Sequence, residues 1–162
     1  TQSLSNGVVK WSKWMIYVLY GQPGSGKTTL SQLLCTYIHH HPAGNEAVVI
    51  DGDKFRTIFK QTDYSPKGRK NNITAANTVA TYIHEVHGVD VILALVNPYD
   101  HLRAELRANN SQVTEILLES DRDLRRDYHV DDFEIGEPDH VINTNSSPGD
   151  TWGVLKGLLN VR

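Results

Sequence analysis

The run from Gly21 to Thr28 limits the choice of fold more than any other feature of the sequence. It reads G-Q-P-G-S-G-K-T and fits the phosphate-loop pattern G-x-x-x-x-G-K-[ST] without a mismatch. An apolar run at 15–20 precedes it, and an amphipathic stretch from Leu30 to Ile38 follows it. A strand, a loop and a helix in this order are the context in which the pattern predicts a phosphate-binding site.

The residue types of this loop suit a nucleoside triphosphate. Its glycines let backbone N–H groups turn inward around a phosphate, and the start of the helix adds its positive dipole end. Lys27 would reach the β- and γ-phosphates, and Thr28 would offer a hydroxyl to Mg²⁺. A chance glycine-rich turn with a surface lysine is the alternative. We predict ATP and Mg²⁺ as cofactors, and a nucleotide-binding set of Gly21, Gln22, Pro23, Gly24, Ser25, Gly26, Lys27, Thr28 and Thr29.

Composition narrows the function classes. The chain has 162 residues, 39% of them apolar, which suits one globular domain. We expect residues 15–162 to form that domain and residues 1–14 to be an N-terminal extension or an expression remnant. The net charge of −3 argues against a general electrostatic hold on nucleic acid. No apolar run approaches the roughly 20 residues of a membrane span, so we expect a cytoplasmic location and no membrane partner.

Predicted strands and helices alternate along the chain, as they do in α/β proteins. Apolar runs predict strands at 15–20, 46–50, 89–96, 112–118 and 139–143. Helices are predicted at 27–40, 53–61, 66–87, 98–109, 121–127 and 149–160. This pattern indicates a parallel sheet wrapped by helices, in which ligands bind beyond the carboxyl ends of the strands.

Charged residues follow the second predicted strand. Asp51 and Asp53 stand two residues apart, and Arg56 comes three residues later. A kinase needs a carboxylate to hold Mg²⁺ or to take the proton of the acceptor, and an arginine suits an anionic acceptor. A role as helix N-cap would also explain Asp53, and the two roles are compatible.

Two later segments carry further candidates. Ser65 and Pro66 fit a helix start, and the neighbouring Tyr64 and Arg69 fit a site that stacks a base and holds a phosphate or sulfate. A solvated helix start would explain the charges alone. Asn97 would lie at the tip of the third strand, facing the loop, and an ordinary strand-to-helix turn is the alternative there.

These motifs, in this order, resemble those of the adenylylsulfate kinase family, whose members show a phosphate loop, then D-G-D-x-x-R, F-S-x-x-D-R-x-x-N-I and S-P-Y-x-x-x-R. This chain reads D-G-D-K-F-R at 51–56, Y-S-P-K-G-R-K-N-N-I at 64–73 and N-P-Y-D-H-L-R at 97–103. The resemblance implies transfer of the γ-phosphoryl of ATP to the 3′-hydroxyl of adenosine 5′-phosphosulfate, a step of sulfate assimilation. It implies catalytic roles for Lys27, Asp53 and Arg56, and Mg²⁺ contacts from Thr28, Asp51 and Asp53. The implied acceptor site consists of Asp51, Asp53, Arg56, Tyr64, Arg69, Asn72, Val96 and Asn97.

The chain also departs from the family pattern. Asn97 replaces a serine that is proposed to be phosphorylated in the family, so direct in-line transfer would be the only route. Asp100 stands where the family often has an arginine. The long lid of the family is reduced to about residues 122–130. Arg122 and Arg126 in this segment could supply charge or cover the adenine of ATP, and a solvated basic helix is the alternative.

We therefore predict a P-loop nucleoside-kinase-like fold, a three-layer sandwich whose five-stranded parallel sheet has the order 2-3-1-4-5. The predicted function is ATP-dependent phosphorylation of a hydroxyl on a small anionic acceptor, with adenosine phosphosulfate as the first candidate. The alternatives are a kinase of another nucleotide or of a polynucleotide 5′-hydroxyl, and a non-catalytic ATP-binding regulator. The expected partner is a small-molecule nucleotide rather than nucleic acid. A homodimer is a further possibility.

Overall fold

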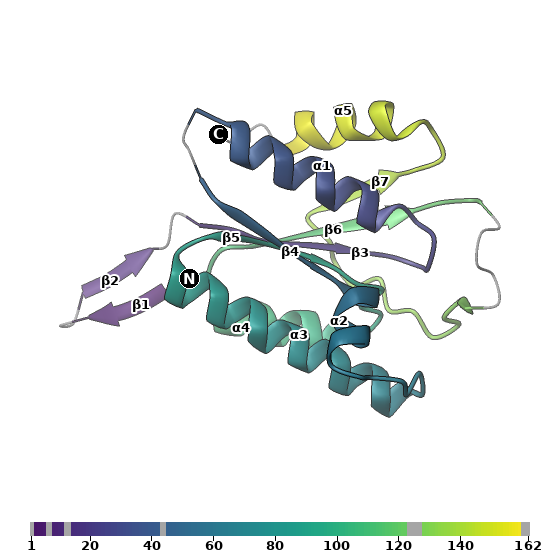
Figure 1. The fold of residues 1–162 in the computed structure, drawn as a ribbon, viewed down its shortest axis with the longest axis horizontal. Helices are drawn as coiled ribbons and strands as arrows, with labels where there is room; N and C mark the ends of the chain where they lie inside the picture. The colour runs from purple at the N-terminus through teal and green to yellow at the C-terminus, as the bar shows by residue number, and fades with distance from the viewer. Residues whose placement is uncertain (1, 6–7, 12–13, 43–44, 123–127, 160–162) are drawn as a thin grey trace.

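The central sheet runs through the middle of the molecule and carries helices on both faces (Figure 1). A computed structural model describes residues 2–5, 8–11, 14–42, 45–122 and 128–159. The strands of this sheet are β3 (Ile16–Tyr20), β4 (Ala47–Asp51), β5 (Asp90–Ala94), β6 (Val113–Glu119) and β7 (His140–Asn143). Their spatial order is β4-β5-β3-β6-β7 and every pair is parallel, so the predicted order 2-3-1-4-5 is confirmed.

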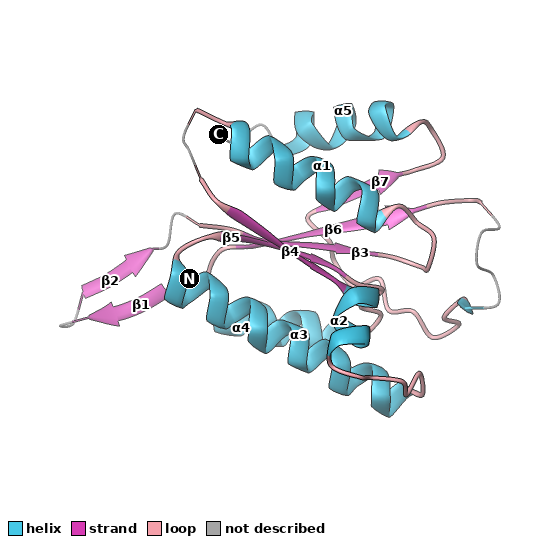
Figure 2. Cartoon of the chain, in the orientation of Figure 1, coloured by secondary structure: helices cyan, strands magenta, loops and turns pink. Residues whose placement is uncertain are grey.

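The two helical layers each cover one face of the sheet. Helices α1 (Lys27–His40) and α5 (Pro148–Leu159) lie on one side, and α3 (Pro66–His87) and α4 (Asp100–Asn109) lie on the other (Figure 2). The short helix α2 (Gly52–Ile58) follows β4 directly. The three-layer arrangement predicted from the sequence is therefore confirmed.

Strand β3 shows why the sheet needs both layers. All five of its residues are buried, and alternate side chains enter different cores. Ile16, Val18 and Tyr20 pack with the α3 side, whereas Tyr17 and Leu19 pack with the α1 and α5 side. Because successive side chains of a strand point to opposite faces, an uninterrupted apolar strand requires cover on both.

Most element boundaries agree with the prediction within three residues, and two regions differ. A two-stranded antiparallel sheet of β1 (Gln2–Ser5) and β2 (Val8–Trp11) lies within the segment that was expected to be an extension or remnant. Residues 121–122 are not helical, and the rest of the helix predicted at 121–127 lies outside the described residues. Among the residues that the structure describes, no helix is both long and apolar enough to cross a membrane.

Candidate active site

A cavity of about 770 Å³ lies beyond the carboxyl ends of the strands, at the place where the strand order reverses. Most residues predicted to bind nucleotides line it: Pro23, Gly24, Gly26, Lys27, Thr28, Thr29, Asp51, Asp53, Arg56, Tyr64, Arg69, Asn72, Val96, Asn97 and Arg122. Gly21, Gln22 and Ser25 are described but are not among its lining residues. Arg126 lies outside the described residues.

The phosphate loop wraps around the side chain of Lys27. The Lys27 ammonium donates to the carbonyl oxygens of Gly21 at 3.0 Å and Gln22 at 2.8 Å, and to Ser25 Oγ at 3.2 Å. These bonds place the positive charge inside the loop, next to the start of α1. Gly26 is the N-cap of α1 and has φ 97°, a left-handed conformation that glycine adopts without strain. The loop thus brings a cation and a helix N-terminus to one end of the cavity.

The base of the loop packs against β6. A Cβ atom at Gly21 would collide with the carbonyl oxygen of Leu118, so only glycine fits there. Thr144, in the loop between β7 and α5, donates its hydroxyl to the Ser25 carbonyl oxygen at 2.7 Å. Thr144 itself is buried. The phosphate loop is therefore packed against β6 and hydrogen-bonded to the residue that follows β7.

Thr28 and Asp51 meet on the cavity wall. Thr28 Oγ1 donates to Asp51 Oδ2 at 2.8 Å, and Asp51 Oδ1 accepts from the backbone N–H of Lys54 at 3.1 Å. Asp51 is thus the N-cap of α2, so the alternative explanation of Asp53 as the cap is wrong. Asp53 lies in the first turn of α2 and also lines the cavity.

The donor set of this wall fits Mg²⁺. Magnesium in kinase sites is held by one or two protein oxygens and otherwise by phosphate and water oxygens. The Thr28 hydroxyl and the Asp51 carboxylate supply two such oxygens, and Asp53 is close in sequence on the same wall. Within the described ranges no cluster of three or more His, Cys, Asp or Glu side chains could hold a metal ion unaided. Phosphate oxygens would therefore have to complete the coordination.

Arg56 and Tyr64 form one unit at the other end of the cavity. The Arg56 guanidinium lies over the Tyr64 ring at 4.1 Å from its centroid, and Arg56 Nη1 donates to the Asp63 carbonyl oxygen at 3.1 Å. Hydrogen bonds from Ser65 lower the pKa of the Asp63 carboxyl group. Ser65 is the N-cap of α3, with Pro66 in its first turn, as predicted. The arginine, the tyrosine and Arg69 give this end of the cavity positive charge and an aromatic ring.

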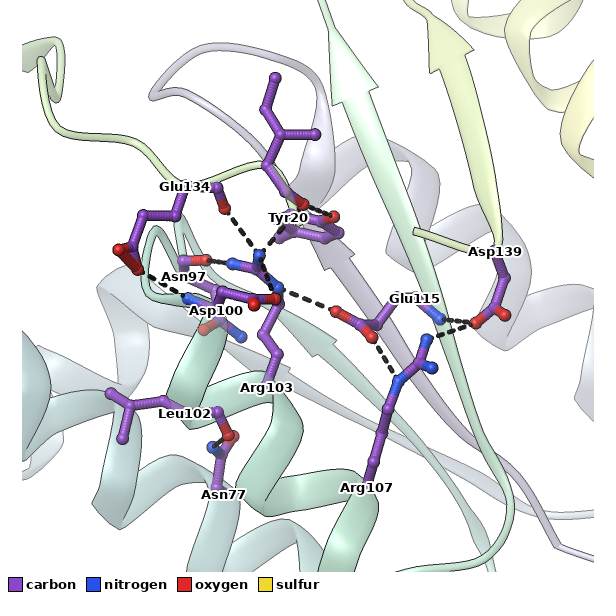
Figure 3. A network of polar contacts seen from close by, with 11 residues as sticks. Tyr20, Asn77, Asn97, Asp100, Leu102, Arg103, Arg107, Glu115, Glu134 and Asp139 are labelled. Atoms are coloured by element: carbon purple, nitrogen blue, oxygen red, sulfur yellow. Dashed lines mark hydrogen bonds and ion pairs between the residues drawn. The ribbon is translucent and has the colours of Figure 1, made fainter. Parts of the chain in front are cut away.

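Arg103, the last residue of the N-P-Y-D-H-L-R motif, is buried next to the site, and no role was predicted for it from the sequence. The Arg103 side chain is fully buried and donates from Nε to Glu115 Oε1 at 2.8 Å (Figure 3). It also donates from Nη1 to the Asn97 carbonyl oxygen and from Nη2 to that of Glu134, each at 2.6 Å. Its guanidinium lies 4.2 Å from the centroid of the Tyr20 ring. Arg103 thus connects α4, β6 and the loop after β5.

The environment of Tyr20 follows from this packing. Burial raises the pKa of the Tyr20 hydroxyl to about 12, although the positive charge of Arg103 opposes the rise. The hydroxyl donates to the Ile135 carbonyl oxygen at 2.6 Å. Tyr20 therefore stays neutral and anchors the segment around Ile135 to the end of β3.

The segment at 122–130, which was expected to stand in place of a longer lid, contacts the phosphate loop through its described residues. Gln22 Nε2 donates to the Val130 carbonyl oxygen, and the Val130 N–H donates to Gln22 Oε1. Tyr128, His129 and Val130 all line the cavity. Arg122 Nη2 donates to Thr144 Oγ1 at 3.3 Å, beside the phosphate loop. The described parts of this segment thus contribute to the donor side of the cavity.

Several known proteins are similar to this chain in sequence. A family profile described as adenylylsulphate kinase matches residues 13–129. The adenylyl-sulfate kinase of Chloroflexus aurantiacus is 32% identical over 120 residues, covering 74% of this chain and 59% of that protein. That of Myxococcus xanthus is 34% identical over 104 residues, covering 64% of this chain and 50% of that protein. The chain thus spans 50–59% of the length of these two relatives.

A solved structure is similar in its fold. The Mycobacterium tuberculosis APS kinase, in complex with AMPPNP and APS, matches with a TM-score of 0.75 at 20% sequence identity. The match covers 92% of this chain and 99% of that chain. At this identity the likeness shows the fold.

Proposed function

Since the chain belongs to the adenylylsulphate kinase family, we propose that it transfers the γ-phosphoryl group of ATP to the 3′-hydroxyl of adenosine 5′-phosphosulfate. One observation carries the proposal: a single cavity is lined both by the residues expected for the donor and by those expected for the acceptor. Phosphoryl transfer depends mainly on positioning and charge neutralisation, so bringing the two sets together is the main requirement.

On the donor side, the backbone of the phosphate loop and Lys27 would hold the β- and γ-phosphates. The Lys27 ammonium would exchange bonds within its own loop for bonds to phosphate oxygens, because both lie within reach of the same flexible side chain. Thr28 and Asp51 would hold Mg²⁺, which supplies positive charge to the phosphate oxygens when it is bound.

On the acceptor side, Arg56 and Arg69 would hold the anionic phosphosulfate, and Tyr64 would contact the adenine. The Asp53 carboxylate would accept the proton of the attacking hydroxyl. The hydroxyl oxygen forms a bond to the γ-phosphorus while the bond from that phosphorus to the leaving ADP oxygen breaks. Asn97 offers no hydroxyl, so the transfer is direct, without a phosphorylated residue at this position. A cytoplasmic location suits a reaction that consumes ATP.

A coupled ADP-release assay tests the proposal. It compares adenosine 5′-phosphosulfate with other nucleotides, nucleosides and 5′-hydroxyl oligonucleotides in the presence of Mg-ATP. We expect turnover on the phosphosulfate and a loss of about 10²–10⁴-fold in kcat for Asp53→Ala. The matched control is Glu105→Ala, because Glu105 is exposed on α4 and lies outside the cavity.

Other outcomes would replace the proposal. Turnover on a different acceptor alone would indicate a kinase of that acceptor. Mg-ATP binding without turnover on any acceptor would instead support an ATP-binding regulator.

A further inference from the structure

Asn97 carries a side chain that the fold buries without satisfying. The residue is 1% exposed and lines the cavity. Neither Oδ1 nor Nδ2 of its carboxamide has a hydrogen-bond partner among the described residues. Buried amides are nearly always paired, so a buried amide on a cavity wall without partners indicates a ligand that supplies them. The conclusion holds for either orientation of the amide, because both of its polar atoms lack partners.

The backbone of Asn97 is held in an uncommon conformation. Its φ is 52°, in the left-handed region, where asparagine is found more often than other residues with a Cβ atom. Arg103 Nη1 donates to the Asn97 carbonyl oxygen at 2.6 Å, and Arg103 is itself fixed by Glu115 (Figure 3). The preceding carbonyl oxygen, of Val96, accepts from the Gly21 N–H at 3.2 Å. The fold therefore fixes where the Asn97 amide lies.

The neighbours of Asn97 place it beside the phosphate loop and the start of α2. Its preceding residue Val96 accepts from the phosphate loop, and Ala94 of the same strand pairs with Asp51, the N-cap of α2. Asn97 lines the same cavity as the residues expected for the donor and those expected for the acceptor.

The chemistry of an amide restricts what can bind to it. A carboxamide presents an acceptor and a donor side by side, whereas phosphate or sulfate oxygens only accept. An anionic group would therefore leave Oδ1 unsatisfied. Asn72 Oδ1, also buried and on the cavity wall, lacks a partner among the described residues too. Two such oxygens require a ligand surface that donates hydrogen bonds.

We propose that Asn97 is a specificity-determining residue that binds a neutral donor–acceptor pair on the acceptor, away from its anionic group. This inference rests on the proposed function and refines its acceptor site. Two parts of a nucleotide present such a pair: the neighbouring hydroxyls of a ribose, and the edge of adenine that carries an amino group beside a ring nitrogen. In either case the anionic group of the acceptor would bind Arg56 and Arg69.

The test is a set of binding titrations with the donor site filled by Mg-AMPPNP. The probes are AMP, its 2′-deoxy analogue, which breaks the hydroxyl pair, and purine riboside 5′-monophosphate, which lacks the amino group of the base edge and so offers no donor there in either orientation of the amide. The proteins are the wild type, Asn97→Ala, and Asn71→Ala as the matched control, since Asn71 is exposed on α3 and lies outside the cavity. Turnover of adenosine 5′-phosphosulfate is measured in parallel.

We expect the wild type to bind one analogue at least about tenfold more weakly than AMP, because that analogue leaves the buried amide unpaired. In Asn97→Ala this preference falls to within about twofold, while Asn71→Ala keeps it. The ratio is measured within each variant, so a general loss of affinity does not imitate the effect. Equal binding of all three probes by the wild type, or an unchanged ratio in Asn97→Ala, would overturn the inference while turnover persists. Absence of both AMP binding and turnover would overturn the proposed function with it.

Discussion

Gln22 holds Val130 through both polar atoms of its side chain, with Nε2 2.8 Å from the Val130 carbonyl oxygen and Oε1 2.9 Å from the Val130 nitrogen. The two residues are 108 positions apart in the chain. The contact joins the phosphate loop to the end of the segment at 122–130, which was expected to stand in place of a longer lid. The Gln22 side chain therefore binds protein, and the contact with the nucleotide that the sequence predicts would come from its backbone.

Replacing Gln22 with alanine should free the backbone of Val130 from the phosphate loop. Two hydrogen bonds of about 1 kcal/mol each are lost, so we expect up to about 30-fold weaker binding of Mg-ATP and faster hydrogen exchange at the Val130 amide. Gln32→Ala, on the exposed side of α1, is the control and should change neither quantity. An unaltered hydrogen-exchange rate at the Val130 amide would show that other contacts hold this backbone in place.

Asp51 should govern the magnesium requirement. Asp51→Asn removes the charge that faces Thr28 but keeps an oxygen able to cap α2. We expect the Mg²⁺ concentration for half-maximal turnover to rise at least about tenfold, because a neutral amide is a weaker ligand than a carboxylate. Thr28→Ser retains the hydroxyl and should stay close to the wild type. A Mg²⁺ dependence that is the same in Asp51→Asn and the wild type would remove Asp51 from the metal site.

Local patterns were sufficient to predict the sheet and the phosphate loop. Short runs of sequence predict both the strand before Gly21 and the helix after it. The alternation of strands and helices along the chain predicts that the strands pair in parallel. The approximate position of the cavity followed from the same rule, since ligands bind at the carboxyl ends of parallel strands. Ser65 and Pro66 marked the start of α3 because capping is also local.

Contacts between distant segments could not be predicted in this way. Nothing near Gln22 in the sequence points to Val130, and no sequence pattern was recognised for the antiparallel strands β1 and β2. Glu115 did leave a signal, because a carboxylate within the apolar strand β6 must have a buried partner. Its partners Arg103 and Arg107 became evident only when α4 was placed over the sheet.

The pair of Arg103 and Glu115 should make a large contribution to stability. Arg103→Leu removes one of the two arginines that pair with Glu115, the other being Arg107, and it also removes the donor to the carbonyl oxygens of Asn97 and Glu134. We therefore expect the free energy of unfolding to fall by about 3 kcal/mol. Adding Glu115→Leu should recover part of the loss, because Arg107 is partly exposed and compensates the buried carboxylate only in part. Urea denaturation of both variants measures this. If the double variant is no more stable than Arg103→Leu, the main role of Arg103 is to hold the carbonyl oxygens rather than to neutralise Glu115.

His84 should make the fold sensitive to mild acid. Burial lowers the pKa of His84 below its ordinary value of 6.5, and Nδ1 lies 3.2 Å from the Val89 carbonyl oxygen. The folded state thus favours the neutral ring, and its contribution is complete above pH 6.5 and is lost as the pH falls from there through the lowered pKa. We expect the free energy of unfolding to decline there by up to about 1.4 kcal/mol per pH unit.

His84→Gln provides the comparison for this pH effect, because glutamine can donate to the same carbonyl oxygen and does not titrate. The difference in unfolding free energy between the wild type and this variant should shrink as the pH is lowered below 6.5. Parallel pH profiles of the two proteins would assign the acid sensitivity to other groups.

Transfer of a labelled γ-phosphoryl group from Mg-ATP to adenosine 5′-phosphosulfate tests the central claim most directly. The account predicts one labelled nucleotide product, phosphorylated at the 3′ position, with ADP formed in equal amount and no label retained on the protein. Lys27→Ala should abolish the product. Label that stays on ATP, or passes to the protein before it reaches the acceptor, would contradict the account.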